Sequence, residues 1–316
     1  MADLAAVSDQ LRPMMFSIAY RMLGSVAEAE DIVQDAFVRM HRTPAAEVDS
    51  PAAYASTVTT RLAIDHLRSA RVRRERYVGS WLPEPLLTSG DEADPAVRAE
   101  VADTISMAFL VLLESLSPVE RAVFLLREVF GYGYDRIASV VERSEPNCRQ
   151  IFGRARARIE ERRPRFEVSR VRRDELARRF FVACETGDIS ALEQLLADDV
   201  VFYGDGGGKA PAVRRPVEGR LQVARLVRGV VRRVIALGLR IEPAEVNGQP
   251  GARIVQPDGQ VFSVVALDIA EGRVQALRNV LNPDKLHHLR VRVRPSDGGE
   301  GNCVGPGRPR HVRGAP

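Results

Sequence analysis

The hydrophobic positions predict a helical N-terminal region. Within residues 8–76, apolar side chains recur at intervals of one, three and four residues, which places them on one face of a helix. The clearest such run is made of Ile32, Val33, Ala36, Phe37 and Met40. Ser25 stands where a cap of this helix would stand. Ser50-Pro51 indicates the start of another helix, because proline is favoured in a first turn.

A different pattern follows. Residues 77–100 contain prolines and glycines that exclude a long regular element, so they are interpreted as a linker. Trp81 and Leu82 are apolar residues within it, and we expect them to dock on another surface. Residues 104–165 return to helical spacing. Ser117-Pro118 starts one helix, and Gly131-Tyr-Gly133 interrupts the pattern before two more.

The last region with a clear hydrophobic pattern combines helical spacing with the alternation typical of strands. Between residues 174 and 286, two amphipathic helices precede strand-like segments, and a helix at about 218–236 interrupts the strands. The expected strands are Val200–Tyr203, Leu239–Val246, Arg253–Val255, Gln260–Asp268 and Val274–Val280. Helices followed by curved strands predict an α+β cone. Residues 291–316 have little apolar content, and we expect them to be disordered.

Length and composition narrow the class of protein. A chain of 316 residues is long enough for two or three domains, each with its own core. The longest unbroken apolar run, Met107–Leu113, is too short to span a membrane, and the N-terminus does not resemble a secretory signal. We therefore expect a cytoplasmic protein without a membrane partner. The three cysteines, Cys148, Cys184 and Cys303, form no CxxC pair, so neither a disulfide framework nor a zinc site is expected.

The distribution of charge along the chain suggests a kind of partner. The net charge is only +4, but arginines cluster at 68–76 and again at 149–165, after an acidic segment at 28–35. Two basic segments separated by a linker suggest two contacts with a polyanion, although solvated helix faces would give the same pattern. Of the 46 basic residues only Lys209 and Lys285 are lysines, so each suggests a specific requirement for an ammonium group.

Residues 134–158 fit a helix-turn-helix. Ile137 and Val141 face inward from the first helix, and Ser144 is placed to cap the second by accepting a backbone N–H. Cys148, Phe152 and Ile159 face inward from that second helix. Its outward residues suit base edges in the major groove, and Arg156 and Arg158 suit phosphates. The outward residues are Asn147, Arg149, Gln150, Gly153 and Arg154.

Three motifs occur in order at matching spacing: 29-AEDIVQDAFVR-39, 62-LAIDHLR-68 and 116-LSPVER-121. Together they resemble the extracytoplasmic-function sigma-70 factors over residues 10–163. The resemblance implies that Asp31, Gln34 and Asp35 bind core RNA polymerase, whose beta-prime clamp and beta flap are the expected partner surfaces. It implies that Asp65, Arg68 and Arg71 approach the −10 element, that groups near 54–60 hold its opened strand, and that the helix-turn-helix reads duplex promoter DNA at −35. Arg61 and Glu142 depart from the residues common in that family.

The remaining part resembles the SigJ-type subgroup, which has a fused SnoaL-like domain. Three motifs carry this resemblance: 81-WLPEP-85, 205-DGGGK-209 and 282-NPDKL-286. It implies that the fused domain packs on the linker and regulates the factor in cis, so that no separate anti-sigma factor is required. We expect each lysine to meet a carboxylate such as that of Glu84. The predicted regulatory contacts are Trp81, Leu82, Glu84, Asp205, Lys209, Asn282, Asp284 and Lys285.

The expected fold is therefore multidomain, with two all-α sigma domains, the second containing the helix-turn-helix, followed by an α+β SnoaL-like cone. The predicted divisions are a region 2 domain at 1–77, a linker at 78–103, a region 4 domain at 104–165, a SnoaL-like domain at 174–290 and a tail at 291–316. The predicted function is an alternative sigma factor that directs transcription initiation.

Two other functions remain open. SnoaL-like cones also host enzymes, so the domain could bind or convert a small molecule as well. However, the cone has no histidine up to Leu286, and no catalytic residue, metal site or cofactor is expected. His287 and His288 are adjacent and poorly placed to share a metal. A one-component repressor would use the helix-turn-helix alone and would leave the acidic helix unexplained. Run-off transcription with core polymerase distinguishes these functions.

Overall fold

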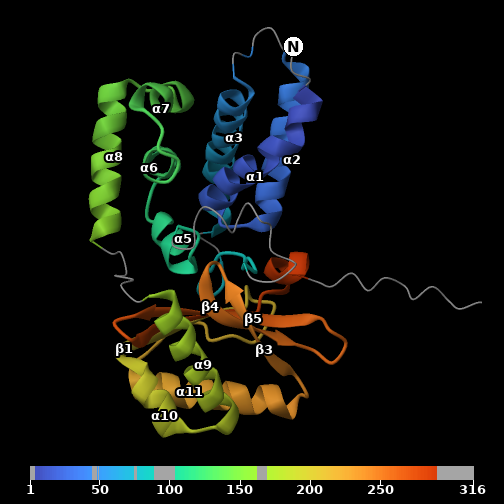
Figure 1. The fold of residues 1–316 in the computed structure, drawn as a ribbon, viewed down its shortest axis with the longest axis vertical. Helices are drawn as coiled ribbons and strands as arrows, with labels where there is room; N and C mark the ends of the chain where they lie inside the picture. The colour runs from blue at the N-terminus through green and yellow to red at the C-terminus, as the bar shows by residue number, and fades with distance from the viewer. Residues whose placement is uncertain are drawn as a thin grey trace, which may run out of the picture.

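The structure is a computed structural model that describes residues 4–44, 48, 50–74, 77–88, 104–161 and 169–289. The chain begins with three helices that pack on one another: α1 (Leu4–Leu23), α2 (Val26–Arg42) and α3 (Pro51–Arg74) (Figure 1). Ser25 caps α2 as predicted, because its hydroxyl accepts the backbone N–H of Glu28 at 3.2 Å.

Four helices follow the linker: α5 (Met107–Leu113), α6 (Pro118–Glu128), α7 (Tyr134–Val141) and α8 (Glu145–Glu160). A reciprocal capping box between Ser117 and Glu120 starts α6. The last two helices form the predicted helix-turn-helix. One detail was wrong: Ser144 is the N-cap residue of α8, but its side chain makes no capping hydrogen bond. Pro146 in the first turn has no N–H, so α8 starts with fewer donors to satisfy.

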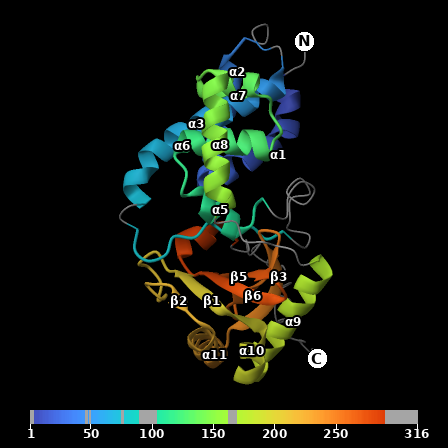
Figure 2. The same cartoon turned by 90° about the vertical axis from the view of Figure 1, so that its left-hand side faces the viewer.

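The two helical groups share one apolar core. It runs from Met15 and Leu23 in α1 to Phe124 and Leu125 in α6, and α6 contacts both α1 and α3. The buried guanidinium of Arg121 donates to the carbonyl of Met22 at 2.6 Å across this junction. α7 contacts α3, and α8 packs on α6 and α7 (Figure 2).

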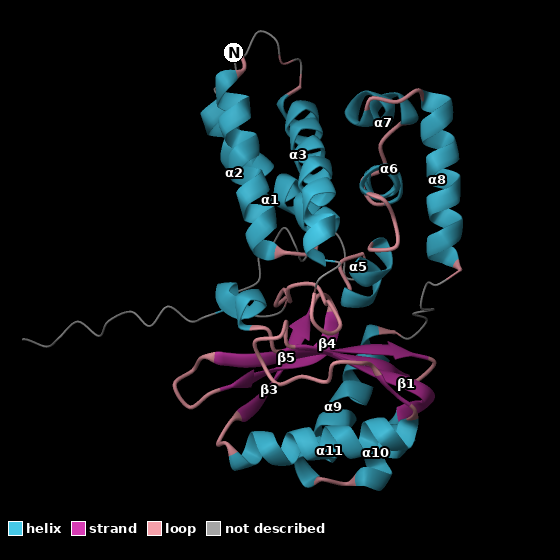
Figure 3. Cartoon of the chain, turned by 180° about the vertical axis from the view of Figure 1, so that it is seen from behind, coloured by secondary structure: helices cyan, strands magenta, loops and turns pink. Residues whose placement is uncertain are grey.

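The C-terminal part is a six-stranded sheet with three helices on one face (Figure 3). These helices are α9 (Arg170–Thr186), α10 (Ile189–Leu195) and α11 (Arg220–Ala236). The strands are β1 (Leu196–Asp205), β2 (Val217–Glu218), β3 (Arg240–Val246), β4 (Gln249–Val255), β5 (Val261–Ala270) and β6 (Arg273–Val280), in the order β2-β1-β6-β5-β4-β3. Only β1 and β6 pair in parallel. The helical N-terminal region lies on the opposite side of the sheet.

The predicted fold class is confirmed, with differences at element ends. The two-residue strand β2 was missed because it is too short to show alternation. β1 is longer than the expected strand Val200–Tyr203, because it starts at Leu196 and ends at Asp205. β4 starts at Gln249, directly after the Asn247-Gly248 turn that joins it to β3. The predicted tail lies outside the described residues, and none of the described helices is both long and apolar enough to cross a bilayer.

Candidate functional site

The residues predicted to bind polymerase share an exposed face of α2. Asp31, Gln34 and Asp35 are all exposed. Val38, one turn further along, is also 49% exposed, which is unusual for a large apolar side chain. The opposite face of α2 packs into the helical core through Ile32, Val33 and other residues. This surface therefore combines carboxylates with one apolar side chain and can accept a protein partner.

The predicted −10 residues on α3 are only partly accessible. Asp65 and Arg68 are exposed and form an ion pair with each other at 3.1 Å. Arg71 belongs to α3, but its side chain lies outside the described part. Thr59 and Thr60, expected to help hold unstacked bases, are buried, and each hydroxyl donates at 2.7 Å to a backbone carbonyl one turn earlier. In this arrangement they cannot contact a DNA strand.

The second helix of the helix-turn-helix presents a polar surface. Asn147, Arg149, Gln150, Arg154 and Arg158 are exposed on α8, while Cys148 and Ile159 are buried under it as predicted. Two of the arginines already have partners. Arg149 lies over the ring of Tyr134, 4.5 Å from its centroid, and pairs with Glu145 at 3.0 Å. Arg158 donates to the carbonyl of Ser115 at 3.1 Å.

Two arginines join α3 to α7. Arg61 on α3 donates to the carbonyls of Val140 at 3.0 Å and Ser139 at 2.8 Å, and it pairs with Glu142 at 3.2 Å. Arg136 on α7 donates to the hydroxyl of Ser56 at 2.8 Å. The two positions that depart from the family pattern, Arg61 and Glu142, thus contact each other. Glu142 also has a φ of 55°, a backbone conformation that favours glycine.

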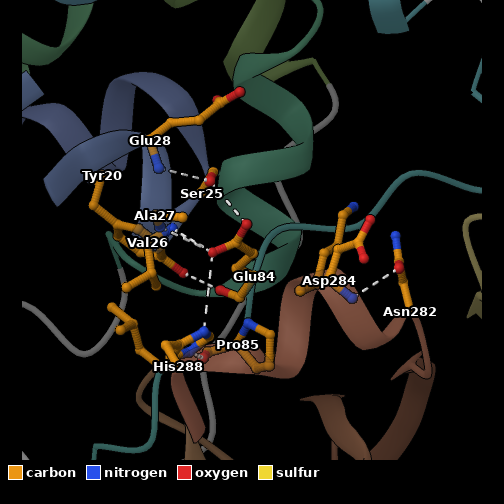
Figure 4. A network of polar contacts seen from close by, with 12 residues as sticks. Tyr20, Ser25, Val26, Ala27, Glu28, Glu84, Pro85, Asn282, Asp284 and His288 are labelled. Carbon is orange, nitrogen blue, oxygen red and sulfur yellow. Dashed lines mark hydrogen bonds and ion pairs between the residues drawn. The ribbon is translucent and has the colours of Figure 1, made fainter. Parts of the chain in front are cut away.

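Glu84 of the linker caps α2. Its carboxylate accepts the backbone N–H of Val26 at 2.7 Å and of Ala27 at 3.2 Å, and the hydroxyl of Ser25 at 2.8 Å (Figure 4). A carboxylate is stabilised at a helix N-terminus by the unpaired N–H groups and the helix dipole. The buried Tyr20 hydroxyl donates to the Glu84 carbonyl at 2.7 Å. The linker is therefore fixed to the helix that carries the predicted polymerase surface.

A second buried cluster fixes the linker to the cone. Asp205, at the end of β1, is fully buried, and its Oδ2 accepts the ammonium of Lys285 and the backbone N–H of Leu82, at 2.7 and 2.8 Å. The hydroxyl of Tyr77 donates to the other carboxylate oxygen, and Asn282 donates to that hydroxyl at 2.9 Å. Lys285 also donates to the Leu82 carbonyl. Burial, followed by the hydrogen bond to Asp205, raises the pKa of Tyr77 well above its usual value.

The apolar linker residues dock as expected. Leu82 is buried in a small core with Met107, Val264 and Leu286. The ring of Trp81 lies between Lys285, whose Nζ is 4.5 Å from the ring centroid, and Gly24, which ends α1. A Cβ on Gly24 would approach the ring to 2.8 Å, and the φ of Gly24 is +68°. Glycine is therefore required at this close approach.

The lysines find other carboxylates than the one predicted. Lys209 pairs with Asp284 at 2.5 Å and Lys285 with Asp205. The expectation that Glu84 would meet a lysine was wrong, because its oxygens accept donors at the start of α2 instead. The structure does bring the 205–209 turn against the 282–286 segment, which forms most of the 3-10 helix η2 (Pro283–Leu289). Of the eight predicted contact residues, Trp81, Leu82, Asp205, Asn282 and Lys285 meet at the junction between linker and cone. Glu84 faces α2 instead, and Lys209 and Asp284 pair with each other within the cone.

Asn247 is a central contact that the sequence analysis missed. It is completely buried in the β3–β4 turn. Its Nδ2 donates to the hydroxyl of Tyr20 at 2.7 Å and to the carbonyl of Ile105 at 2.8 Å, while its Oδ1 accepts the N–H of Leu86 at 2.9 Å. One side chain thus joins the cone to α1, to the linker and to the residues before α5. The Asn-Gly pair at 247–248 is a turn signal, but it does not indicate which surface the turn meets.

The cone offers little for catalysis or metal binding. Asp268 on β5 pairs with Arg278 at 2.8 Å, and burial raises its pKa. Asp205 on β1 already accepts donors from Lys285 and the linker. In the parts of the chain that the structure describes, no three His, Cys, Asp or Glu side chains gather as metal ligands would. His288 lies beside Pro85, with its Nε2 2.8 Å from the Pro85 carbonyl.

Comparisons with known proteins agree with this architecture. Three family models match the chain: Sigma-70 region 2 at residues 8–73, Sigma-70 region 4 at 106–159 and a SnoaL-like domain at 177–281. The ECF RNA polymerase sigma factor SigJ of Mycobacterium tuberculosis is 37% identical over 88% of this chain and 91% of its own length. The probable ECF sigma factor SigI of the same species is 31% identical over 89% of this chain and 94% of its own length.

Solved structures give the same result. The crystal structure of M. tuberculosis SigJ matches with a TM-score of 0.72 and 33% identity, over 90% of this chain and 98% of the other. The relatives indicate a transcription regulator rather than an enzyme. From the two helical domains, the cone and these relatives, we conclude that the chain belongs to the extracytoplasmic function sigma factors of RNA polymerase, as an alternative sigma factor with a fused SnoaL-like domain.

Proposed function

We propose that this chain binds core RNA polymerase, directs it to promoters, and is held by its fused domain in a closed arrangement that must open for promoter recognition. The observation that carries the proposal is the direct contact between α3 and α7 through Arg61. Each of these helices belongs to a different DNA-reading domain. The regulation is therefore built into the chain itself.

Polymerase binding is assigned to the exposed face of α2. Asp31, Gln34 and Asp35 are exposed and would meet the beta-prime clamp, with the region 4 helices meeting the beta flap. Reversing two charges should abolish this contact without disturbing the core, since both side chains are exposed. Asp31→Arg with Asp35→Arg should prevent co-elution with core polymerase. The matched control reverses two exposed acids of the cone, Glu185→Arg with Asp258→Arg, and should co-elute normally.

Promoter binding is divided between α3 and α8. Asp65, Arg68 and Arg71 would approach the −10 element. On α8, Arg149 and Gln150 have the forked groups that read guanine and adenine, joined by Asn147 and Arg154, and Arg158 suits a phosphate. Arg149→Ala and Gln150→Ala should each weaken −35 binding by about 1–3 kcal/mol and relax base preference. Arg158→Ala should weaken all duplexes alike and flatten the dependence on salt.

Distance supports the need for opening. The numbers in the names of the −10 and −35 elements place them about 25 base pairs apart. This is roughly 85 Å along B-form DNA at ~3.4 Å per base pair. A helix of 16 residues such as α8 is only about 24 Å long. Two domains that share one apolar core and hold each other through Arg61 cannot span both elements at once. Promoter recognition thus calls for separating α7 from α3.

The cone would set how easily this separation occurs. Its junction with the linker anchors residues 77–88, which in turn cap α2 through Glu84 and lead into the residues before α5. Removing residues 174–316 should release the closed arrangement but also remove the surface that anchors residues 77–88. The spacing of the two sigma domains would then be undefined, and polymerase or promoter affinity should fall. Trimming only 291–316 should leave the junction intact and preserve or raise activity.

Run-off transcription with purified core polymerase tests the proposal. The full chain should direct transcription, and the two truncations should differ as stated. No transcript from the full chain on any selected promoter would refute the sigma function. Equal activity from both truncations and the full chain would refute cis-regulation. We further propose that the cone is not catalytic, that the protein is cytoplasmic, and that no separate anti-sigma factor is needed. Capture of a stoichiometric inhibitory protein from the producing cells would contradict the last point.

A further inference from the structure

The cone contains an apolar cavity that the sigma function does not use. It measures about 330 Å³ and lies between the sheet and α11, bounded by Phe202, Leu226, Val234 and Phe262. A smaller space of about 90 Å³ continues toward α9 and shares Phe202, Val234 and Phe262 with the first. Together they reach the size of a small-molecule site, which is about 300–1,000 Å³. The opening lies along α11, where Val230 is 36% exposed.

One polar side chain in the cavity lacks a partner. Asn279 on β6 lines both spaces and is only 7% exposed. Its Oδ1 is buried and accepts no hydrogen bond. The positions on either side of it along the same strand face, Leu277 and Leu281, are apolar and also line the cavity. A buried carbonyl oxygen without a donor is costly, so this oxygen calls for a donor from a bound water or a ligand.

The electrostatics of the cavity favour a neutral ligand. Among its described lining residues only Arg233 is charged, and Arg233 is exposed at the mouth. Cys184 lines the inner part, and burial raises the pKa of its thiol to about 12, so it carries no charge at neutral pH. A charged group placed beside Asn279 would lose its hydration without gaining an opposite charge. An apolar body with one hydrogen-bond donor fits these walls.

The cavity wall is continuous with the linker junction. Gly204, which lines the cavity, precedes Asp205 on β1, and its neighbour in the parallel pairing with β6 is Asn279. The backbone N–H groups of Leu281 and Asn282 both donate to the carbonyl of Asp205, at 2.7 and 2.9 Å. A ligand that presses on Gly204 or Leu281 therefore acts on the residue that holds Lys285 and Leu82.

We propose that the cone binds a small, neutral, largely apolar molecule whose hydrogen-bond donor meets Asn279 Oδ1, and that filling the cavity is sensed at Asp205 in the linker junction. The binding site stands independently of the sigma function, while its regulatory consequence rests on the proposed cis-regulation. By thermodynamic linkage, a ligand that changes the junction is itself bound differently when the junction is changed.

A cage alcohol and its methyl ether test the site. 1-Adamantanol has an apolar body and one O–H donor, whereas 1-methoxyadamantane has a closely similar body and no donor. Calorimetric titration of the full chain should show that 1-adamantanol binds about five- to tenfold more tightly, the value of one net hydrogen bond. Asn279→Leu should abolish this preference while still binding the methoxy compound. Equal binding of both probes to the unaltered chain, or no binding at all, would overturn the proposal.

A variant at the mouth separates this site from other apolar surfaces. Val230→Phe should obstruct the opening and weaken 1-adamantanol at least tenfold. Val171→Phe, at an exposed valine on α9 that does not line the cavity, is the matched control and should bind normally. Thermal unfolding of each variant verifies the fold. Undiminished binding by Val230→Phe, with the fold intact, would show that the probe lies elsewhere.

The single tryptophan of the chain reports the coupling. Trp81 lies in the linker junction beside Lys285, and neither adamantane probe fluoresces. Saturation with 1-adamantanol should shift Trp81 emission in the unaltered chain and in Val171→Phe. Binding without any shift would overturn the sensing at Asp205, although run-off transcription by the ligand-free protein would still stand as the separate test of the sigma function.

Discussion

The junction between linker and cone and the contact between α3 and α7 are built differently. The junction between linker and cone is buried and contains an ion pair, Asp205 with Lys285, and the fully buried Asn247. The contact between α3 and α7 lies at an edge, where Arg61 keeps 42% of its side chain exposed while it binds carbonyls and Glu142. Buried polar networks are costly to break, whereas exposed ones break and re-form easily. We therefore expect the junction between linker and cone to persist and the contact between α3 and α7 to open.

The largest expected effect comes from breaking the buried pair. Asp205→Ala would leave Lys285 buried without its carboxylate, and the free energy of unfolding should fall by about 3–5 kcal/mol. Urea denaturation measures this change. The control is Asp284→Ala, which removes the exposed partner of Lys209 and should cost less than about 1 kcal/mol. Similar small losses from both variants would mean that the buried pair of the linker junction stabilises the chain no more than an exposed pair does.

A somewhat smaller loss is expected at Asn247. Asn247→Gly keeps a residue suited to the φ of 52° but removes three side-chain hydrogen bonds, so the free energy of unfolding should fall by about 3 kcal/mol. Asn247→Ala should lose slightly more, because alanine also strains the turn. Denaturation of both variants separates the two causes. If Asn247→Gly were as stable as the original chain, the side chain would have no role in joining the cone to α1.

At the α3–α7 contact we expect a small change in stability and a larger change in activity. Arg61→Gln should lower the free energy of unfolding by only about 1 kcal/mol, because the guanidinium is partly solvated. The same change would favour the open arrangement about fivefold, and run-off transcription should rise accordingly.

Glu142→Gly is the companion variant. It removes the ion pair with Arg61 and also relieves the strained φ of 55°, so transcription should rise without a loss of stability. Reduced or unchanged transcription from both variants, in chains that bind polymerase normally, would contradict the role given to this contact.

The smallest effect is a pH dependence of the linker junction. Burial lowers the pKa of His288 below its ordinary value of about 6.5, so the folded chain holds the ring neutral, with Nε2–H donating to Pro85. Nearby Glu84 raises that pKa and His287 lowers it, but burial dominates. This contribution is present above the unfolded pKa and is lost as pH falls below about 6.5 toward the folded pKa. His288→Gln should therefore lose less stability than the original chain between pH 7.5 and 5.5, and an identical loss would contradict this assignment.

The sequence predicted the elements better than their contacts. The helical spacing of apolar residues located α2 and α8. The motifs at 81–85, 205–209 and 282–286 marked the junction residues. Both signals could be found because periodicity and short motifs are local properties of the sequence. The partners of Glu84, Lys285 and Asn247 could not be predicted, since each depends on which surfaces meet after folding. The packing of α7 on α3 was missed for the same reason. The roles of the polymerase- and DNA-facing residues, and the domain boundaries, remain predictions.

The central claim is that the two sigma domains are closed in the free chain and separate on a promoter. The distance between nitroxide labels at Gln10→Cys on α1 and Glu160→Cys on α8, both exposed, reports this separation directly. Double electron–electron resonance spectroscopy measures it. Cys148 and Cys184 are buried, and Cys303 would be replaced by serine. We predict one narrow distance distribution in the free chain and an increase on the order of tens of ångströms with core polymerase and promoter DNA, as the ~3.4 Å rise per base pair between −35 and −10 requires. An unchanged distance in a complex that transcribes would contradict the account.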